Sequence, residues 1–469
     1  MMKRFLKQCG ALVMGLALAA GVCLPAQAAA APPATSCYAY IVADADTGQV
    51  LIEKNADETL YPASITKLMT LGLAAQKAGG DWNTTVTVSE EAVYSLLGTD
   101  SSHIALQPGE EVPLADIVYA TQLASANDGA NVLAEYIGGS IEGGVAAMNA
   151  QAAALGLTGT HFENPHGLHA AGHYTTARDM AVIARWALSQ PGYLEVFCHS
   201  GNWEMKPTNL QPESRYFACD DWLKVGRICY RAYAKGGKDG YHSAAHHTYV
   251  NYSEQDGIRL ISVVLAAPSK QERYYDACAL LDYCFENFAR VEVPAERRAL
   301  PLNVQGGGGV LGQVNVNPVG GSVLLHTDTD AAGCTVEYEL PEVWNLGTPL
   351  EAVQVIRVPG GGAQAAGEVR LPMTQTGLDA LLRQVAAADQ AEAERSSGGF
   401  TALFAGGGAA AVLALLLWKK WWTKQGGKTP AAVGADFPIL QWDGETVELN
   451  DRVVKLRRPD GQGRNLPRR

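Results

Sequence analysis

Apolar and polar positions near the start of the chain predict a β-hairpin followed by a helix. Residues 38–42 and 50–53 carry apolar side chains at strand spacing and flank the turn sequence Asp46-Thr47-Gly48. Between residues 66 and 77 the apolar side chains recur every three or four positions, which is the spacing of a helix with one buried face. Ser64 is therefore expected at the N-terminal end of this helix.

The middle of the chain predicts helices and then a second group of strands. Residues 89–185 are rich in helical spacing, and two helices are expected over 114–123 and 130–136. Alternation over 248–252 and 260–266 predicts a hairpin, which follows an edge strand containing Lys238 and precedes a helix over 270–288. This order predicts an α+β domain in which helices pack on an antiparallel sheet.

The pattern changes after residue 290. Short apolar runs such as 323–325 and 353–358, in a stretch broken by glycine clusters, predict a small β-rich domain over 291–372. Leu378, Leu381, Leu382 and Val385 then share one face of a helix expected over 374–396, close to the membrane.

Two uncharged apolar segments near the ends predict export and a membrane anchor. Basic residues precede an apolar run over 11–24 that ends at Ala26-Gln27-Ala28, so 1–28 is expected to be a signal peptide; the alternative, a retained anchor, is disfavoured because the run is short. Residues 400–418 lack charge and precede a lysine cluster, which favours a transmembrane helix over a buried one. We expect a single-pass protein of the cell membrane with a basic cytoplasmic tail over 419–469.

Charge excludes one class of partner. The chain has a formal net charge of −12, and the part expected outside, residues 29–418, carries about −20. Such an acidic domain offers no electrostatic attraction to nucleic acid. The basic residues of the tail are expected to bind the anionic inner leaflet of the membrane, or merely to keep this short tail solvated.

The cysteine count leaves the redox state open. Seven of the nine cysteines fall in the part expected outside, and none of them shows a zinc-like Cys-x-x-Cys spacing. One or two disulfides with spare thiols are expected, and their connectivity is not defined by the sequence.

Three short motifs carry the candidate chemistry. Ser64 is the only serine followed three residues later by a lysine, Lys67, and on a helix these two positions share a face. A buried lysine amine in that position can serve as the base for a serine nucleophile. Ser125-Ala126-Asn127 follows after roughly sixty residues, and Lys238-Asp239-Gly240 after roughly a hundred more.

The sequences around these motifs are similar to those of the D-alanyl-D-alanine carboxypeptidases, the low-molecular-weight penicillin-binding serine peptidases. The other similar segments include 43–51, 164–168 and 174–180, and the resemblance extends over about 37–289. It implies a β-lactamase-like DD-peptidase catalytic domain over 37–289, followed by a β-rich module that lifts this domain from the membrane. It also implies removal of the terminal D-alanine of peptidoglycan stem peptides, acylation by β-lactam antibiotics, and no cofactor.

The resemblance also assigns roles to the motif residues. Ser64 would attack the peptide carbonyl, Lys67 would take its proton, and Ser125 would relay that proton to the departing amine. Asn127 would hold Lys67 and the substrate backbone, although it could simply cap a helix. The Lys238-Asp239-Gly240 strand would bind substrate, with the Lys238 charge on its terminal carboxylate; Lys235 is the rival for that role and is disfavoured because its flanking residues fit the motif less well.

One residue departs from the family pattern. The family carries threonine or serine where this chain has Asp239, and usually threonine at His242. An ionised carboxylate can only accept hydrogen bonds and repels the substrate carboxylate, unless Lys235, Lys238 or His242 neutralises it or it stays protonated. Two alternatives therefore stay open: a degenerate member that binds muropeptide or β-lactam with little turnover, and a β-lactamase.

Four histidines within thirteen residues are only a weak indication of a metal site. His161, His166, His169 and His173 lie close together, but their irregular spacing fits no metalloprotease helix. His166 is expected to brace a loop instead, and no metal site is expected.

Overall fold

The computed structural model describes residues 31–306, 309–361, 365–397, 441–442, 446–449 and 452–455. The predicted signal peptide 1–28 and transmembrane helix 400–418 lie outside the described residues, as does most of the tail 419–469. None of the helices described is long and apolar enough to cross a membrane. The chain divides into two compact units, one of Met1–Leu302, Gln313–Trp344 and Pro349–Thr376, the other of Asn303–Gly312, Asn345–Thr348 and Gly377–Arg469.

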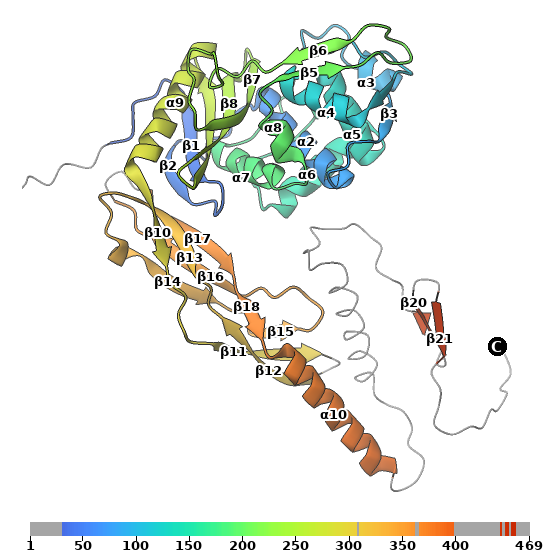
Figure 1. Cartoon of the computed structure of the whole chain (residues 1–469), viewed down its shortest axis with the longest axis vertical. Helices are drawn as coiled ribbons and strands as arrows, with labels where there is room; N and C mark the ends of the chain where they lie inside the picture. Colours follow the sequence, from blue (N-terminus) through green and yellow to red (C-terminus); the bar gives the residue numbers. More distant parts are fainter. Residues whose placement is uncertain are drawn as a thin grey trace, which may run out of the picture. The chain divides into compact units, whose positions relative to one another are not determined.

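The first unit contains a five-stranded antiparallel sheet (Figure 1). Its order is β2 (Val50–Lys54), β1 (Ala39–Asp44), β9 (Ile258–Ala267), β8 (His246–Gln255) and β7 (Ala234–His242). The predicted hairpins are thus confirmed, and the Lys238 strand lies at the edge of the sheet, as expected.

Both faces of this sheet are covered by helices, which is why β1 is buried along its whole length. Ala39 and Ile41 pack with the helices on one face, whereas Tyr40 and Val42 pack with α9 (Lys270–Asn287) on the other. This is the period of two that a strand between two apolar layers requires. The hydroxyl of Ser269 caps α9 by accepting from the Glu272 N–H, so the helix begins where the apolar pattern predicted.

The face opposite α9 carries the helical region (Figure 1). Its central helices are α2 (Lys67–Ala78), α4 (Leu114–Leu123), α5 (Asn127–Gly138) and α7 (Ala177–Leu188). The other elements of this region are α3 (Glu90–Tyr94), α6 (Ile141–Ala154), α8 (Tyr193–Phe197), β3 (Thr85–Thr87), β4 (Glu111–Pro113), β5 (Asn202–Met205) and β6 (Arg215–Ala218). Gly72 on α2 allows close packing, because a Cβ there would lie 2.7 Å from the Trp186 ring.

Strands occupy the segment for which a β-rich domain was predicted. β10 (Phe288–Val293) pairs with β13 (Gly321–His326), and β16 (Val353–Val358) pairs with β14 (Thr335–Glu339) and β17 (Gly367–Pro372). The remaining strands there are β11 (Leu300–Gly306), β12 (Gly309–Asn317), β15 (Val343–Asn345) and β18 (Thr374–Thr376). Short strands β19 (Gln441–Trp442), β20 (Thr446–Leu449) and β21 (Arg452–Lys455) follow in the tail.

The helix predicted over 374–396 begins later than expected. It is α10 (Leu378–Ser397), and residues 374–376 belong to β18 instead. Gly377 separates the two elements with a φ of +93°, a conformation that glycine adopts without strain and that a helix cannot continue through. The apolar face at Leu381 and Leu382 is buried, as the pattern predicted.

The expectation of one or two disulfides is wrong for the described residues, because all seven cysteines among them are free thiols. Four of these cysteines are buried on the α9 side of the sheet, two of them on α9 itself, and fill space there as small apolar side chains: Cys37, Cys229, Cys278 and Cys284. Burial raises the pKa of the Cys37 thiol to about 12, which keeps it protonated.

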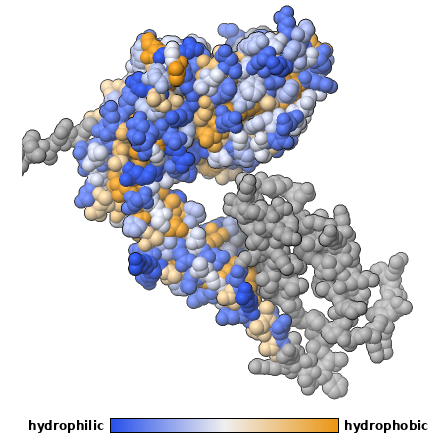
Figure 2. Space-filling view, in the orientation of Figure 1, coloured by the Kyte–Doolittle hydropathy of each residue, from blue (hydrophilic) through white to orange (hydrophobic). Residues whose placement is uncertain are grey.

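The surface shown in Figure 2 is mostly hydrophilic over the described residues of the first unit.

Candidate active site

Ser64 and Lys67 lie at the start of α2, as the motif predicted. Ser64 belongs to a 3₁₀ turn, η1 (Ala63–Thr66), and Lys67 is the first residue of α2, with its side chain fully buried. Ala63 holds a φ of +52°, a left-handed conformation that costs energy for a residue with a Cβ. This turn presents the Ser64 side chain at the edge of the helical region rather than inside it.

The Lys67 amine has three close oxygen neighbours. Nζ lies 2.7 Å from Asn127 Oδ1, 2.8 Å from the His166 carbonyl oxygen and 3.1 Å from Ser64 Oγ. The first two oxygens can only accept, so they take two N–H bonds of the amine. A neutral amine then has one lone pair left, and the remaining partner is the Ser64 hydroxyl. The arrangement therefore sets up Lys67 to accept the Ser64 proton.

The surroundings of Lys67 favour this neutral form. Burial lowers the pKa of its amine well below the ordinary value, and the positive charge of Lys238 lowers it further. The carboxylates of Asp239 and Asp128 act in the opposite direction and do not reverse the shift. The predicted neutral base is thus consistent with its environment.

Ser125 and Lys238 form a second serine–lysine contact. Ser125 connects α4 to α5 with a φ of +55°, and Lys238 Nζ donates to its Oγ at 3.1 Å. Lys238 is buried on β7, and burial lowers the pKa of its amine, although the carboxylate of Asp239 opposes that shift. The three predicted motifs therefore meet at one place, with each serine held by a lysine.

Gly240 allows β7 to approach Ser64 closely. A Cβ at this position would lie 2.7 Å from the Ser64 nitrogen and 2.6 Å from Thr248 Oγ1, so only glycine fits. The backbone of β7 can consequently run directly beside the Ser64 N–H. Backbone N–H groups placed in this way can stabilise the oxyanion of an acyl-transfer reaction.

Asp239 has two positive partners, and one of them was not predicted. Arg273 on α9 binds the Asp239 carboxylate through Nη2, and Lys238 Nζ lies 3.7 Å from its other oxygen. Desolvation raises the pKa of this carboxyl, but Lys238 and Arg273 outweigh it and hold the pKa below its usual range. Lys235 and His242, the other partners considered, form no ion pair with it in the described structure.

Arg273 was missed because no motif surrounds it. The helical pattern places residue 273 near the start of α9, but the contact with Asp239 depends on how α9 crosses the sheet. Its guanidinium is almost fully buried and also donates to the Gly240 carbonyl at 3.1 Å, so it supports the β7 backbone beside Ser64. The contact between this buried arginine and Asp239, the motif residue that differs from the family pattern, can be seen only in the three-dimensional structure.

The histidines brace the loop that contacts Lys67. His166 supplies its carbonyl oxygen to Lys67, and its ring nitrogen Nδ1 accepts from the Leu168 N–H at 3.2 Å. His173 Nε2 lies 2.8 Å from Thr66 Oγ1, and burial lowers the pKa of its imidazole to about 3. Within the described ranges no three His, Cys, Asp or Glu side chains are grouped so as to hold a metal ion.

Comparisons with known proteins agree with this geometry. A family model for D-alanyl-D-alanine carboxypeptidases matches residues 26–269. The D-alanyl-D-alanine carboxypeptidase DacF of Bacillus subtilis is 34% identical over 253 residues, which cover 53% of this chain and 62% of the relative. DacC of Escherichia coli is 35% identical over 266 residues, which cover 55% and 64%. The chain thus spans less than two thirds of the length of these relatives.

A solved structure shows the same fold. Penicillin binding protein 5 from Haemophilus influenzae aligns with a TM-score of 0.56 and 24% identity, and the alignment covers 73% of this chain and 98% of that one. The expected α+β DD-peptidase fold is confirmed by this similarity. Because the matched family segment is more than half of the chain and contains all three motifs, this protein belongs to the D-alanyl-D-alanine carboxypeptidase family.

Proposed function

We propose that this protein is a serine-type D-alanyl-D-alanine carboxypeptidase that removes the terminal D-alanine of peptidoglycan stem peptides and is acylated by β-lactams. The observation that carries the proposal is the Lys67 amine, whose two acceptor partners leave its lone pair for the Ser64 hydroxyl at 3.1 Å. The names of the relatives and of the penicillin binding protein support the choice of substrate and inhibitor.

In the acylation step, Ser64 Oγ bonds to the carbonyl carbon of the penultimate D-alanine while its proton passes to Lys67 Nζ. The N–H groups near Ser64 and β7 stabilise the negative charge that develops on the carbonyl oxygen. The carbon–nitrogen bond then breaks and leaves an ester on Ser64.

In the departure step, the amine of the terminal D-alanine takes a proton from Ser125 Oγ, which Lys238 holds through a 3.1 Å contact. Ser125 in turn takes the proton that Lys67 had received from Ser64, so Lys67 returns to its neutral form. The Lys238 charge attracts the terminal carboxylate, and Asn127 keeps the Lys67 amine in place. Water then hydrolyses the ester and regenerates Ser64.

A specific observation favours a second candidate function, a member that binds but turns over slowly. Asp239 already forms ion pairs with Lys238 and Arg273, the two cations nearest to it. A substrate carboxylate must therefore compete with an internal carboxylate for the same partners. The further alternative, a β-lactamase, differs in releasing hydrolysed penicillin rapidly instead of retaining it on Ser64.

We also propose that the protein is exported and anchored by a single helix over 400–418, with the catalytic domain on the extracytoplasmic face of the cell membrane. Support comes from the uncharged segment and the lysine cluster that follows it. The β-rich segment would then lie between the catalytic domain and the anchor along the chain.

Fluorescent penicillin followed by peptide mapping tests the acylation. A single adduct on the peptide containing Ser64 is expected, and the Ser64→Ala variant should acquire none. Persistence of the label over hours supports a penicillin-binding peptidase, whereas its loss within seconds with release of hydrolysed penicillin identifies a β-lactamase. An adduct that survives in Ser64→Ala contradicts the assignment of the nucleophile.

A further inference from the structure

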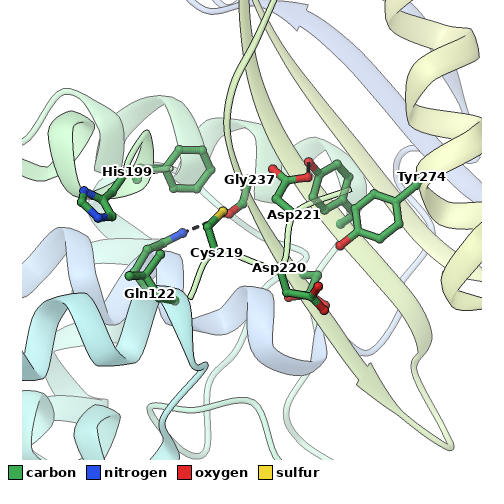
Figure 3. Close-up of a pocket in the computed structure, with 11 residues that line it drawn as sticks. Gln122, His199, Cys219, Asp220, Asp221, Gly237 and Tyr274 are labelled. Atoms are coloured by element: carbon green, nitrogen blue, oxygen red, sulfur yellow. Dashed lines mark hydrogen bonds between the residues drawn. The ribbon is translucent and has the colours of Figure 1, made fainter. Parts of the chain in front are cut away.

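Alternate residues of β7 face opposite sides of the strand. Gly237 and Asp239 line the small cavity in Figure 3, where the Gln122 amide donates to the Gly237 carbonyl oxygen at 3.0 Å. The volume of this cavity is about 30 Å³, the space of one water molecule, so no substrate group fits there. The other side of β7 presents Lys238 and, four residues later, His242, to which the proposed mechanism gives no role.

Along β7, His242 lies beyond Ser64 as seen from Lys238. Gly240, midway between them, is the residue at which a Cβ would lie 2.7 Å from the Ser64 nitrogen. A strand rises about 3.4 Å per residue, so His242 is about 7 Å past this point. If Lys238 holds the terminal carboxylate, His242 is on the acyl side of the scissile bond, within reach of the side chain that precedes the two D-alanines.

His242 belongs to a cluster of three rings from three segments of the chain. Its ring centroid lies 5.4 Å from that of His169 and 6.1 Å from that of Tyr61, and the last two are 4.7 Å apart. Tyr61 precedes Ser64 by three residues. Tyr61 and His242 are half-buried and His169 is exposed, so the cluster is open to solvent.

Both imidazoles have hydrogen-bonding atoms to spare. Nδ1 of His242 accepts from the Ala245 N–H at 3.0 Å, so the neutral ring carries its proton on Nε2. The two nitrogens of an imidazole point in nearly opposite directions, so this Nε2–H is directed away from the turn at Ala245. Neither it nor the ring nitrogens of His169 have a hydrogen-bond partner among the described residues.

The charge around the cluster indicates which ligand would complete it. Burial lowers the pKa of the His242 imidazole, the neighbouring His169 lowers it further, and no carboxylate opposes the shift. A cation would add to this repulsion. An anion would relieve it and would accept strong hydrogen bonds from the two N–H groups. In a peptide substrate that anion is a carboxylate.

We propose that His169 and His242 form a subsite for a side-chain carboxylate on the residue that precedes the two D-alanines. The Nε2–H of His242 and a ring N–H of His169 donate to this carboxylate, and Tyr61 packs against both rings and positions them. The location relative to the scissile bond rests on the proposed function. The subsite would favour stem peptides whose diamino acid carries a carboxylate beside its side-chain amine over peptides with lysine there.

Binding of two matched peptides tests the subsite without any turnover. The full chain carrying Ser64→Ala is titrated calorimetrically with two acetylated tripeptides that end in D-alanyl-D-alanine. One begins with diaminopimelate and the other with its side-chain amide, which has nearly the same shape without the negative charge. The peptide with the free carboxylate is expected to bind at least tenfold more tightly, and equal affinity for the two peptides overturns the proposal.

The His242→Asn change in the same background then locates the effect. Asparagine Oδ1 takes the place of Nδ1 as the acceptor for the Ala245 N–H, while the Nε2–H donor is lost. The preference should therefore fall below threefold, and binding of the amide peptide should stay within twofold.

His246→Asn is the matched control, because His246 is an exposed histidine directly opposite His242 in the hairpin and has no ring contact with the cluster. This variant should keep the full preference. Loss of the preference in His246→Asn, or its survival in His242→Asn, contradicts the assignment.

Turnover by the unmodified protein separates this inference from the proposed function. If the carboxylate peptide is preferred in binding but neither peptide is cleaved, the carboxypeptidase assignment fails and the subsite stands. If both peptides are cleaved and neither is preferred in binding, the subsite fails and the carboxypeptidase assignment stands.

Discussion

Asp239→Thr should make this protein a faster carboxypeptidase. Asp239 pairs with Lys238 and Arg273, so under the proposed function a substrate carboxylate would have to compete with it for these two cations. Threonine removes that competitor and adds a hydroxyl that can donate to the substrate. The expected result is a higher kcat/KM for D-alanine release from a stem pentapeptide at neutral pH.

The size of the gain follows from the ion-pair geometry. Two unit charges 3.7 Å apart, the Lys238–Asp239 separation, interact by about 4 kcal/mol at an effective dielectric near 20. The Asp239 side chain is 45% exposed, so solvent screening reduces this to about 1–2 kcal/mol. Since about 1.4 kcal/mol corresponds to tenfold, kcat/KM should rise about five- to thirtyfold.

The assay is enzymatic detection of D-alanine from a pentapeptide that ends in D-alanyl-D-alanine, over a range of substrate concentrations. Glu254→Gln is the control, because it removes one exposed carboxylate from the neighbouring strand β8 and should leave kcat/KM unchanged. Lys238 and Arg273 hold the pKa of Asp239 below its usual range, so it stays ionised at pH 5 and acidification should bring no gain.

Two results would refute this reasoning. One is a wild-type protein that releases D-alanine as fast as Asp239→Thr does, which would mean that the paired carboxylate does not hinder the substrate. The other is a rise of wild-type activity between pH 7 and pH 5 that Asp239→Thr lacks, which would show that Asp239 acts in its protonated form.

Three further predictions follow from the same contacts. Lys67→Ala should abolish penicillin acylation without unfolding the protein, as read by intact mass and circular dichroism, and normal acylation would exclude Lys67 as the base. In the wild type the acylation rate should fall as pH decreases through the lowered pKa of Lys67, with an inflection well below 10.5; an inflection at 10.5 would mean an unperturbed amine. Gly240→Ala should slow acylation about a hundredfold, because its Cβ would lie 2.7 Å from the Ser64 nitrogen, and an unchanged rate would show that β7 need not approach so closely.

Much of the fold could be predicted from the spacing of apolar residues alone, because each helix or strand buries one or both of its faces in the core. The alternation at residues 38–42 and the helical period at 66–77 each reported a buried surface, and both elements formed within two residues of their expected ends. The start of α10 was harder to predict, because the apolar pattern begins at Leu378 and does not show that residues 374–376 form β18, from which Gly377 separates the helix.

The candidate site likewise contains residues that could be predicted from the sequence and residues that could not. Ser64, Lys67, Ser125, Asn127 and Lys238 were predictable because each belongs to a short motif whose spacing has a chemical reason. Their convergence is now described, while their roles stay predictions until tested.

Arg273 could not be predicted, because it belongs to no motif and acquires its importance from a contact across the fold. Arg273 meets Asp239 only because α9 crosses the outer face of the sheet. The disulfide expectation failed for a related reason, since cysteine number says nothing about which elements bring thiols together.

The most direct test of the central claim is the release of D-alanine from a stem pentapeptide by the purified full chain, with Ser64→Ala measured in parallel. The account predicts one D-alanine per pentapeptide consumed, a tetrapeptide as the other product, and no release by Ser64→Ala. Release by Ser64→Ala at the wild-type rate, or no release by wild type and by Asp239→Thr alike, would contradict it.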